Sequence, residues 1–199
     1  MIRVFEVEIL CALRHFAHGT VGSLYFVGCV MKKWQKDVEA FMSMISDDKK
    51  AIYGQIIDVL LMYEYRPIKN RCKGFVMSFK KMSHRRVIAT VGVRQNSTEP
   101  FFGLRFSACT KYSDKFSDVV RDRLLSNNSR LAKCSSCGYC TGSMFVYSYT
   151  FSDGETKSAC GAFILEIPNI TVDDIVEIER LVKEQHEYFE KYADWNWTK

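Results

Sequence analysis

The sequence predicts one α+β domain, in which helices pack on an antiparallel sheet of about five strands. Apolar residues recur every three or four positions in the segments expected to be helical, and at every second position in three consecutive strand-like segments. The links between these three segments are too short for the crossovers that parallel strands require. The composition, 47% hydrophobic and 26% charged with three prolines, is typical of a folded protein.

Two helices are expected at the start of the domain. Residues 36–44 place their apolar side chains on one side of a helix. In the second helix, either Asp47 or Asp48 can cap the first turn, and apolar residues then recur at three- and four-residue intervals. This helix should end before Pro67, because the residue that precedes a proline avoids the helical conformation.

A meander of three antiparallel strands is expected next. In each strand, large apolar residues alternate with polar or small ones, so that one face of the sheet should be buried. The three segments are residues 75–80, 87–93 and 102–108.

The remaining elements are a helix, a hairpin and a final helix. The first of these helices should begin at Ser113 or Asp114 and end at about Leu125. The hairpin follows in a cysteine-rich stretch. The last helix is long, and Thr171 and Asp174 at its start have the spacing of a capping box.

The first thirty residues are predicted to be an extension, residues 1–30, that precedes a single domain of residues 31–199. They are apolar but carry charged side chains, so no run reaches the roughly 20 uncharged residues that a membrane-spanning helix needs. A secretion or lipidation signal is disfavoured, because glutamates stand where a basic leader is expected. Translation from Met31 would give an ordinary cytoplasmic start, and we expect a cytoplasmic protein.

The stretch from Cys134 to Cys160 has the pattern of a specific chemical site. Cys134, Cys137 and Cys140 form two overlapping C-x-x-C pairs, and Cys160 follows on the return strand of the hairpin. Thiolates two residues apart can chelate a zinc ion, and structural zinc sites take four such ligands. The other four cysteines are scattered singly in apolar runs, as buried cysteines of a reducing compartment are. The pattern therefore predicts a closed, structural zinc site.

Three alternatives to zinc stay open. The C-x2-C-x2-C spacing with a distant fourth cysteine resembles half of a bacterial ferredoxin motif, which would hold an iron-sulfur cluster, although glycine follows Cys160 where that motif has proline. The cysteines could instead form a dithiol switch or a disulfide. They could also bind nothing and serve only in packing.

The expected hairpin geometry complicates the four-cysteine site. If Asp153 and Gly154 close a two-residue turn, Cys160 lies opposite Tyr147, and Cys140 is seven residues further along that strand. The loop that carries the first three cysteines must then fold back over the hairpin. His186 on the final helix is the reserve ligand if Cys160 does not reach the ion.

The segment from residue 64 to residue 94 is strongly basic. It holds nine Lys and Arg residues against one acid, Glu64. Cations beside aromatic residues on a sheet face can bind nucleic acid or another anionic ligand. The alternative, which we favour, is that the large apolar residues face the core and the cations lie in loops and on the solvated face. The candidate ligand-binding residues are Lys80, Arg85, Arg94 and Arg105.

Arg105 has an additional requirement, because it is expected midway along a strand among apolar neighbours. A buried guanidinium needs an anionic partner. The candidate partners are Glu166, a bound ligand and a phosphate.

Catalytic motifs are absent from the sequence. It contains no G-x-S-x-G, P-loop, G-x-G-x-x-G or H-E-x-x-H pattern, and no deaminase pattern. None of its four histidines has an evident serine or cysteine partner. The sequence therefore favours a binding or accessory protein over an enzyme.

Residues 47–192 resemble an uncharacterised family of small cysteine-cluster proteins from anaerobic, clostridia-like bacteria. The resemblance lies in three blocks, FFGLRFSACTKYSDKFSDVVRD, YTFSDGE and IPNITVDDIVEIERLVKEQHEYF. It implies a bacterial origin and leaves out the first thirty residues, in agreement with a start at Met31. The family has no known activity, so the resemblance implies no catalytic residues.

Overall fold

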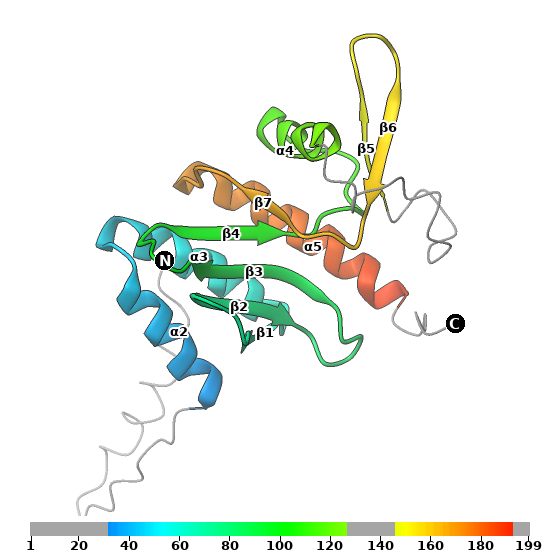
Figure 1. Ribbon diagram of the computed structural model, residues 1–199. Helices are drawn as coiled ribbons and strands as arrows, with labels where there is room; N and C mark the ends of the chain where they lie inside the picture. Colours follow the sequence, from blue (N-terminus) through cyan, green and yellow to red (C-terminus); the bar gives the residue numbers. More distant parts are fainter. Residues whose placement is uncertain (1–31, 127–145, 193–199) are drawn as a thin grey trace, which may run out of the picture. The chain divides into compact units, whose positions relative to one another are not determined.

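The computed structural model describes residues 32–126 and 146–192, and its first helix begins at Lys33 (Figure 1). The architecture is α+β, as predicted, with a five-stranded antiparallel sheet in the order β1-β2-β3-β4-β7. The strands of this sheet are β1 Arg66–Lys69, β2 Phe75–Lys80, β3 Val87–Val93, β4 Pro100–Leu104 and β7 Leu165–Ile167. A separate hairpin consists of β5 Val146–Thr150 and β6 Thr156–Cys160. The helices are α2 Lys33–Met44, α3 Asp47–Met62, α4 Asp114–Leu125 and α5 Ile175–Lys191, which follows the 3-10 turn η4 Val172–Asp174.

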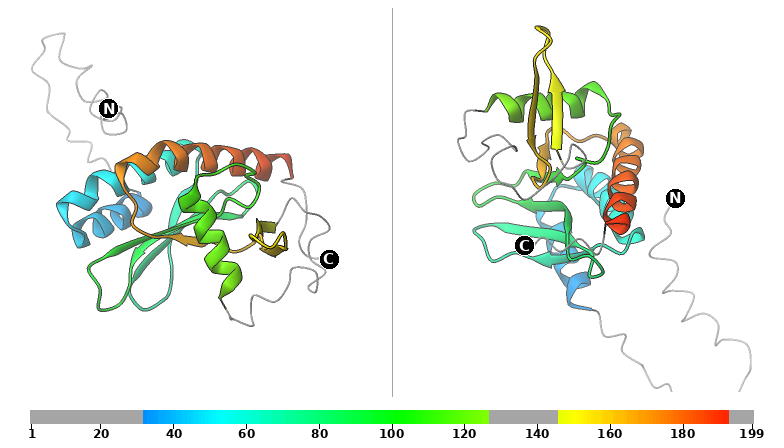
Figure 2. Two further views of the ribbon diagram at one scale, coloured as in Figure 1. Left: turned by 90° about the horizontal axis from the view of Figure 1, so that it is seen from above. Right: turned by 90° about the vertical axis from the view of Figure 1, so that its right-hand side faces the viewer.

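Helices α3 and α5 lie on one face of the five-stranded sheet (Figure 2). Their buried residues recur at helical spacing, because each helix presents one apolar stripe to the core. The sheet contributes Phe75, Met77 and Phe79 from β2, each at most 5% exposed. The inward orientation that we favoured for these three residues is therefore confirmed. Burial of one such side chain stabilises the fold by about 1.5–3 kcal/mol.

Residues that border the helices follow the expected pattern with small differences. The N-cap of α3 is Ser46, and Asp47 and Asp48 lie in the first turn instead of capping it. The capping box of Thr171 and Asp174 is present as predicted. Helix α4 begins after its N-cap Ser113 and ends at Leu125, as predicted.

The predicted strand at residues 102–108 is wrong in its second half, because β4 ends at Leu104. After Leu104 the chain turns, and Cys109 donates a backbone hydrogen bond to the carbonyl of Phe106. Two edge strands, β1 and β7, complete the sheet in place of the hairpin strands. With four and three residues they are too short to show a clear alternation in sequence.

The hairpin register also differs from the prediction by one residue. Cys160 pairs with Val146, and Tyr147 pairs with Ala159. The loop between Thr150 and Thr156 is longer than two residues, because Gly154, at φ +83°, donates a hydrogen bond to the Phe151 carbonyl. As a result Tyr147 and Ala159 point into the core, and Cys160 is half-buried.

Tyr147 joins the hairpin to the rest of the domain. Its hydroxyl donates to the carbonyl oxygen of Phe163 at 3.0 Å and accepts from the backbone N–H of Phe106 at 3.1 Å. Its ring meets that of Phe106 edge to face, with centroids 5.1 Å apart. Tyr147 is 2% exposed, and burial raises the pKa of its hydroxyl, so the hydroxyl remains a donor.

Gly54 in α3 is a site where alanine should stabilise the protein. A β-carbon at Gly54 would have only Met42 Cε near it, at 3.8 Å, and alanine raises helix propensity. We expect Gly54→Ala to raise the free energy of unfolding by about 0.5–1 kcal/mol, measured by urea denaturation. The matched change Gly92→Ala should have the opposite sign, because its β-carbon would lie 2.3 Å from the carbonyl oxygen of Phe75. Equal effects at both positions would contradict this packing.

In the described part of the chain, every helix is too short or too polar to cross a lipid bilayer.

Candidate functional site

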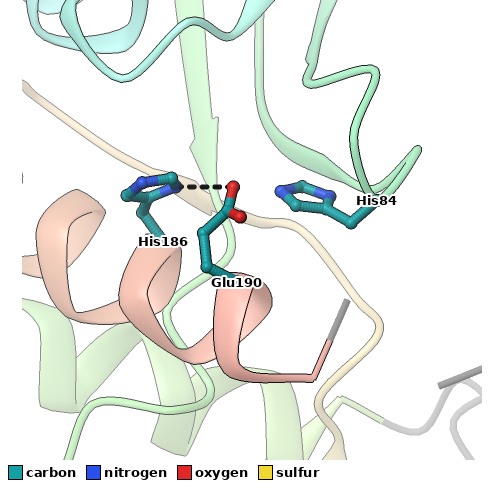
Figure 3. Close-up of side chains that lie close together, drawn as sticks. All are labelled: His84, His186 and Glu190. Atoms are coloured by element: carbon teal, nitrogen blue, oxygen red, sulfur yellow. Dashed lines mark ion pairs between the residues drawn. The ribbon is translucent and has the colours of Figure 1, made fainter. Parts of the chain in front are cut away.

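Three side chains that are able to bind a metal ion converge where the β2–β3 connection meets the C-terminal half of α5 (Figure 3). His84 comes from the connection, and His186 and Glu190 come from α5. The two α5 residues are four apart, so they lie on one face of the helix. One ligand atom from each of the three residues lies within 4.8 Å of those of the other two.

The turn after β2 directs His84 inward. Arg85 adopts the left-handed conformation, at φ 56°, and its N–H bonds to the carbonyl of Lys81 at 2.9 Å. His84 is 8% exposed, and its ring packs on that of Phe189 with centroids 5.1 Å apart.

Tyr65 lies between the two histidines. Its hydroxyl is 3.4 Å from His84 Nε2 and 3.4 Å from His186 Nδ1. The end of α3 places it there, because Glu64, at φ 64°, allows the N–H of Tyr65 to bond back to the carbonyl of Leu60. This backward turn, and not Pro67, is what ends the helix.

A lysine flanks the carboxylate of this cluster. Lys81 Nζ lies 2.9 Å from Glu190 Oε1 and 3.2 Å from Glu64 Oε2, and its side chain is 15% exposed. The side chain of Glu190 is 40% exposed, so the carboxylate forms the solvent side of the cluster and the histidines its inner side.

The protonation states suit metal binding. Burial, aided by the charges of Arg86 and Lys81 against that of Glu190, lowers the pKa of His84 to about 4. Burial and Lys81 also lower the pKa of His186. The hydrogen bond from Lys81 lowers the pKa of Glu190. At neutral pH the cluster therefore holds two neutral imidazoles and one carboxylate, which are the ligating forms.

The hydrogen bonds of His84 define its tautomer. The backbone N–H of Arg86 donates to His84 Nδ1 at 3.1 Å, so in the neutral ring the proton is on Nε2, which faces Tyr65. A cation at Nε2 would require this proton to leave or to move to Nδ1. Metal binding should therefore be coupled to a change at the Arg86 backbone.

The predicted cysteine site falls mainly outside the described residues, which do not include Cys134, Cys137 and Cys140. Cys160 ends β6 as a free thiol. The cluster that contains His186, the reserve ligand, includes no cysteine among residues 32–126 and 146–192. Zinc or an iron-sulfur cluster at the four cysteines stays a prediction.

The fold does not gather the four candidate anion-binding residues at one place. Arg94 follows β3 at the end where Phe75 pairs with Val93, whereas Lys80 is at the opposite end of β2. Arg94 forms an ion pair with Glu166 and lies over the Phe101 ring at 4.8 Å.

The other two candidates, Arg85 and Arg105, lie apart from Arg94. Arg85 belongs to the turn that orients His84, and Arg105 is buried next to α5. Glu166, a candidate partner of Arg105 in the sequence, pairs with Arg94 instead. Nucleic-acid binding by the basic segment stays a prediction.

Sequence reasoning missed the histidine cluster, although one local signal was present. The four-residue spacing of His186 and Glu190 on a predicted helix indicates two potential ligands on one face. The positions of His84 and Tyr65 depend on tertiary contacts, since Tyr65 and His186 are 121 residues apart.

Comparison with protein-family models, with curated proteins and with solved structures found no match to the chain.

Proposed function

We propose that the protein is a binding module for a divalent transition-metal ion, held by His84, His186 and Glu190. The observation that carries the proposal is the convergence of two neutral imidazoles and one carboxylate within 4.8 Å. Two histidines and one carboxylate are a ligand set that zinc accepts, with a water or another group in the fourth position.

The geometry requires only a small closure. Ligands about 2.0–2.1 Å from a tetrahedral zinc lie roughly 3.4 Å from one another. The side-chain atoms, which lie within 4.8 Å of one another, must therefore approach by up to about 1.4 Å, which rotation of the half-exposed Glu190 side chain on α5 can supply. The Tyr65 hydroxyl contacts His84 Nε2 and His186 Nδ1 in the metal-free protein, so an ion bound at these nitrogens would replace both contacts.

The positive charge of Lys81 should repel a bound cation, and this repulsion gives a distinctive test of the metal site. Its ammonium contacts Glu190 in the metal-free protein, and Glu64 offers it a second carboxylate when a cation takes Glu190. Removal of the lysine charge should strengthen metal binding by removing a nearby repulsion. A purely structural role for the cluster predicts no such gain.

The test is titration of the metal-free full chain with Zn²⁺ against a competing chelator. Loss of a partner that only orients a ligand already weakens metal affinity about 10- to 100-fold, so His186→Ala should weaken it by at least 100-fold. Glu179→Gln, an exposed change on the same helix, should leave affinity unchanged, and Lys81→Met should raise it. Equal affinity of wild type and His186→Ala would refute the site.

A four-cysteine site is a second proposal, supported by three cysteines within seven residues. Co²⁺ in place of zinc separates the two sites, because cobalt bound to thiolates absorbs strongly in the near ultraviolet and cobalt bound to imidazole and carboxylate does not. Strong absorbance that Cys137→Ser removes and His186→Ala leaves would support the cysteine site. Its rival, an iron-sulfur cluster, predicts coloured protein that contains iron.

A further inference from the structure

We propose that Arg105 is the centre of a binding site for a small oxyanion of the phosphate or carboxylate class. The site is separate from the proposed metal site and does not depend on it. It lies where the chain leaves β4 and passes against the C-terminal half of α5.

Arg105 is a buried cation whose guanidinium has no anionic partner among the described residues. The residue is 7% exposed, and its backbone is held by a hydrogen bond from its N–H to the carbonyl of Ile88 at 2.8 Å. Within residues 32–126 and 146–192, Arg105 Nε is buried without a hydrogen-bond partner, and no carboxylate there forms an ion pair with this side chain. Glu166, the acidic partner expected from sequence, is paired with Arg94.

The surroundings add positive charge to this position. The guanidinium carbon of Arg105 is 4.8 Å from the centroid of the Phe189 ring, and that of Arg86 is 5.2 Å from the same centroid. Arg86 donates to the carbonyl oxygens of Phe189 and Tyr192, at 3.3 and 2.6 Å. One aromatic ring therefore faces two guanidinium groups.

This arrangement is costly unless an anion joins it. Arginine stays protonated in proteins, and an uncompensated buried charge is strongly destabilising even after the protein relaxes. The cation–π contact with Phe189 offsets only part of that cost. Burial and the like charge of Arg86 both act against the charged form and lower the pKa of Arg105.

A second buried donor, on α5, lacks a hydrogen-bond partner among the described residues. Gln185 is 0% exposed and lies one helical turn before Phe189 on the buried face of α5. Its Oε1 accepts from the N–H of Ala108, three residues after Arg105, at 3.0 Å. Its Nε2 has no hydrogen-bond partner among the described residues. Arg105 Nε and Gln185 Nε2 are therefore two buried donors without a partner among the described residues, and both residues contribute to the packing of α5 against the chain that follows β4.

An oxyanion is the ligand that these donors fit. The planar guanidinium presents parallel N–H groups that match two oxygens of a carboxylate or a phosphate. A halide offers no second acceptor in that plane, and a neutral ligand would leave the charge uncompensated. The chemistry therefore selects a small group with at least two negative oxygens.

The experiment measures thermal unfolding of the full chain against inorganic phosphate, acetate and chloride at equal ionic strength. Saturable stabilisation by phosphate or acetate, beyond that by chloride, is expected, and the more effective ion identifies the class. Arg105→Met should weaken the apparent affinity for that ion at least tenfold. Arg66→Met is the matched control, because the Arg66 guanidinium also lies near a ring, 5.2 Å from the centroid of Trp34, yet Arg66 is exposed.

Two outcomes would overturn the proposal: the same stabilisation by all three ions, or an unchanged response in Arg105→Met. If Arg105→Met does not fold, Arg105→Lys decides, because lysine keeps the charge but loses the planar pair of donors. An affinity unchanged in Arg105→Lys would contradict the site. His186→Ala should respond to the oxyanion as wild type does, so the failure of one proposed site is distinguishable from the failure of the other.

Discussion

Replacement of Phe189 by alanine is expected to lower the free energy of unfolding by about 4 kcal/mol, in the middle of the range for a buried phenylalanine. Phe189 is 0% exposed, and its ring packs on His84 and faces the guanidinium groups of Arg86 and Arg105. The truncation would leave a cavity and remove the aromatic face from both cations. Urea denaturation monitored by circular dichroism gives the measurement.

Two variants test whether the cations contribute to this loss. Phe189→Leu keeps an apolar side chain but removes the ring, so it should lose about 1–2 kcal/mol, less than alanine does. Phe151→Ala removes a ring that lies 5.2 Å from Lys157 in the exposed hairpin loop, and it should lose less than about 1 kcal/mol. A loss at Phe189 no larger than that at Phe151 would mean that Phe189 does not hold this region together.

Acidification of the metal-free protein is expected to lower the free energy of unfolding by about 2 kcal/mol between about pH 7 and pH 5, through His84 alone. The pKa of His84 falls from its ordinary 6.5 to about 4 in the folded protein. Between these values the unfolded chain binds a proton that the folded chain does not. Stability is therefore fully present above the unfolded pKa and is lost as pH falls toward 4.

The groups that face His84 explain why the folded protein resists this proton. Arg86 and Lys81 are positive, His186 is a second, half-buried imidazole, and only Glu190 favours the charged ring. The pKa of Glu190 is itself lowered, so its protonation at low pH also reduces stability.

His84→Gln isolates the contribution of the histidine. Glutamine does not titrate, so the dependence of the unfolding free energy on pH should be weaker in this variant between about pH 7 and pH 5. The comparison uses the slope of the unfolding free energy against pH. The absolute free energies are not compared, because the substitution also alters packing on Phe189. Parallel slopes in wild type and variant would show that His84 is not buried in its neutral form.

The sequence predicted the inward face of β2 correctly and the register of the β5–β6 hairpin incorrectly. The burial of Phe75, Met77 and Phe79 followed from their alternation, a local signal that the sheet obeys. The placement of Cys160 opposite Tyr147 failed, because a single additional loop residue shifts every cross-strand pair by one. Patterns within a segment were readable, whereas the register between segments depended on turn geometry.

The candidate sites divide in the same way. Sequence reasoning identified Arg105 as a cation in need of a partner, and the structure places it in a buried environment without one among the described residues. Sequence reasoning did not predict that His84 and His186 are neighbours, because no sequence pattern links these two positions. Only the packing of the β2–β3 connection on α5 joins them.

By itself, the sequence determined the α+β class, the presence of α3, the extent of α4, the capping box before α5 and the inward face of β2, because burial periodicity and capping act over one or two turns of chain. The tertiary structure alone decided the edge strands β1 and β7, the separation of the hairpin from the sheet, and the meeting of His84, Tyr65 and His186. These features depend on hydrogen bonds and contacts between distant segments, which no local pattern of residues specifies.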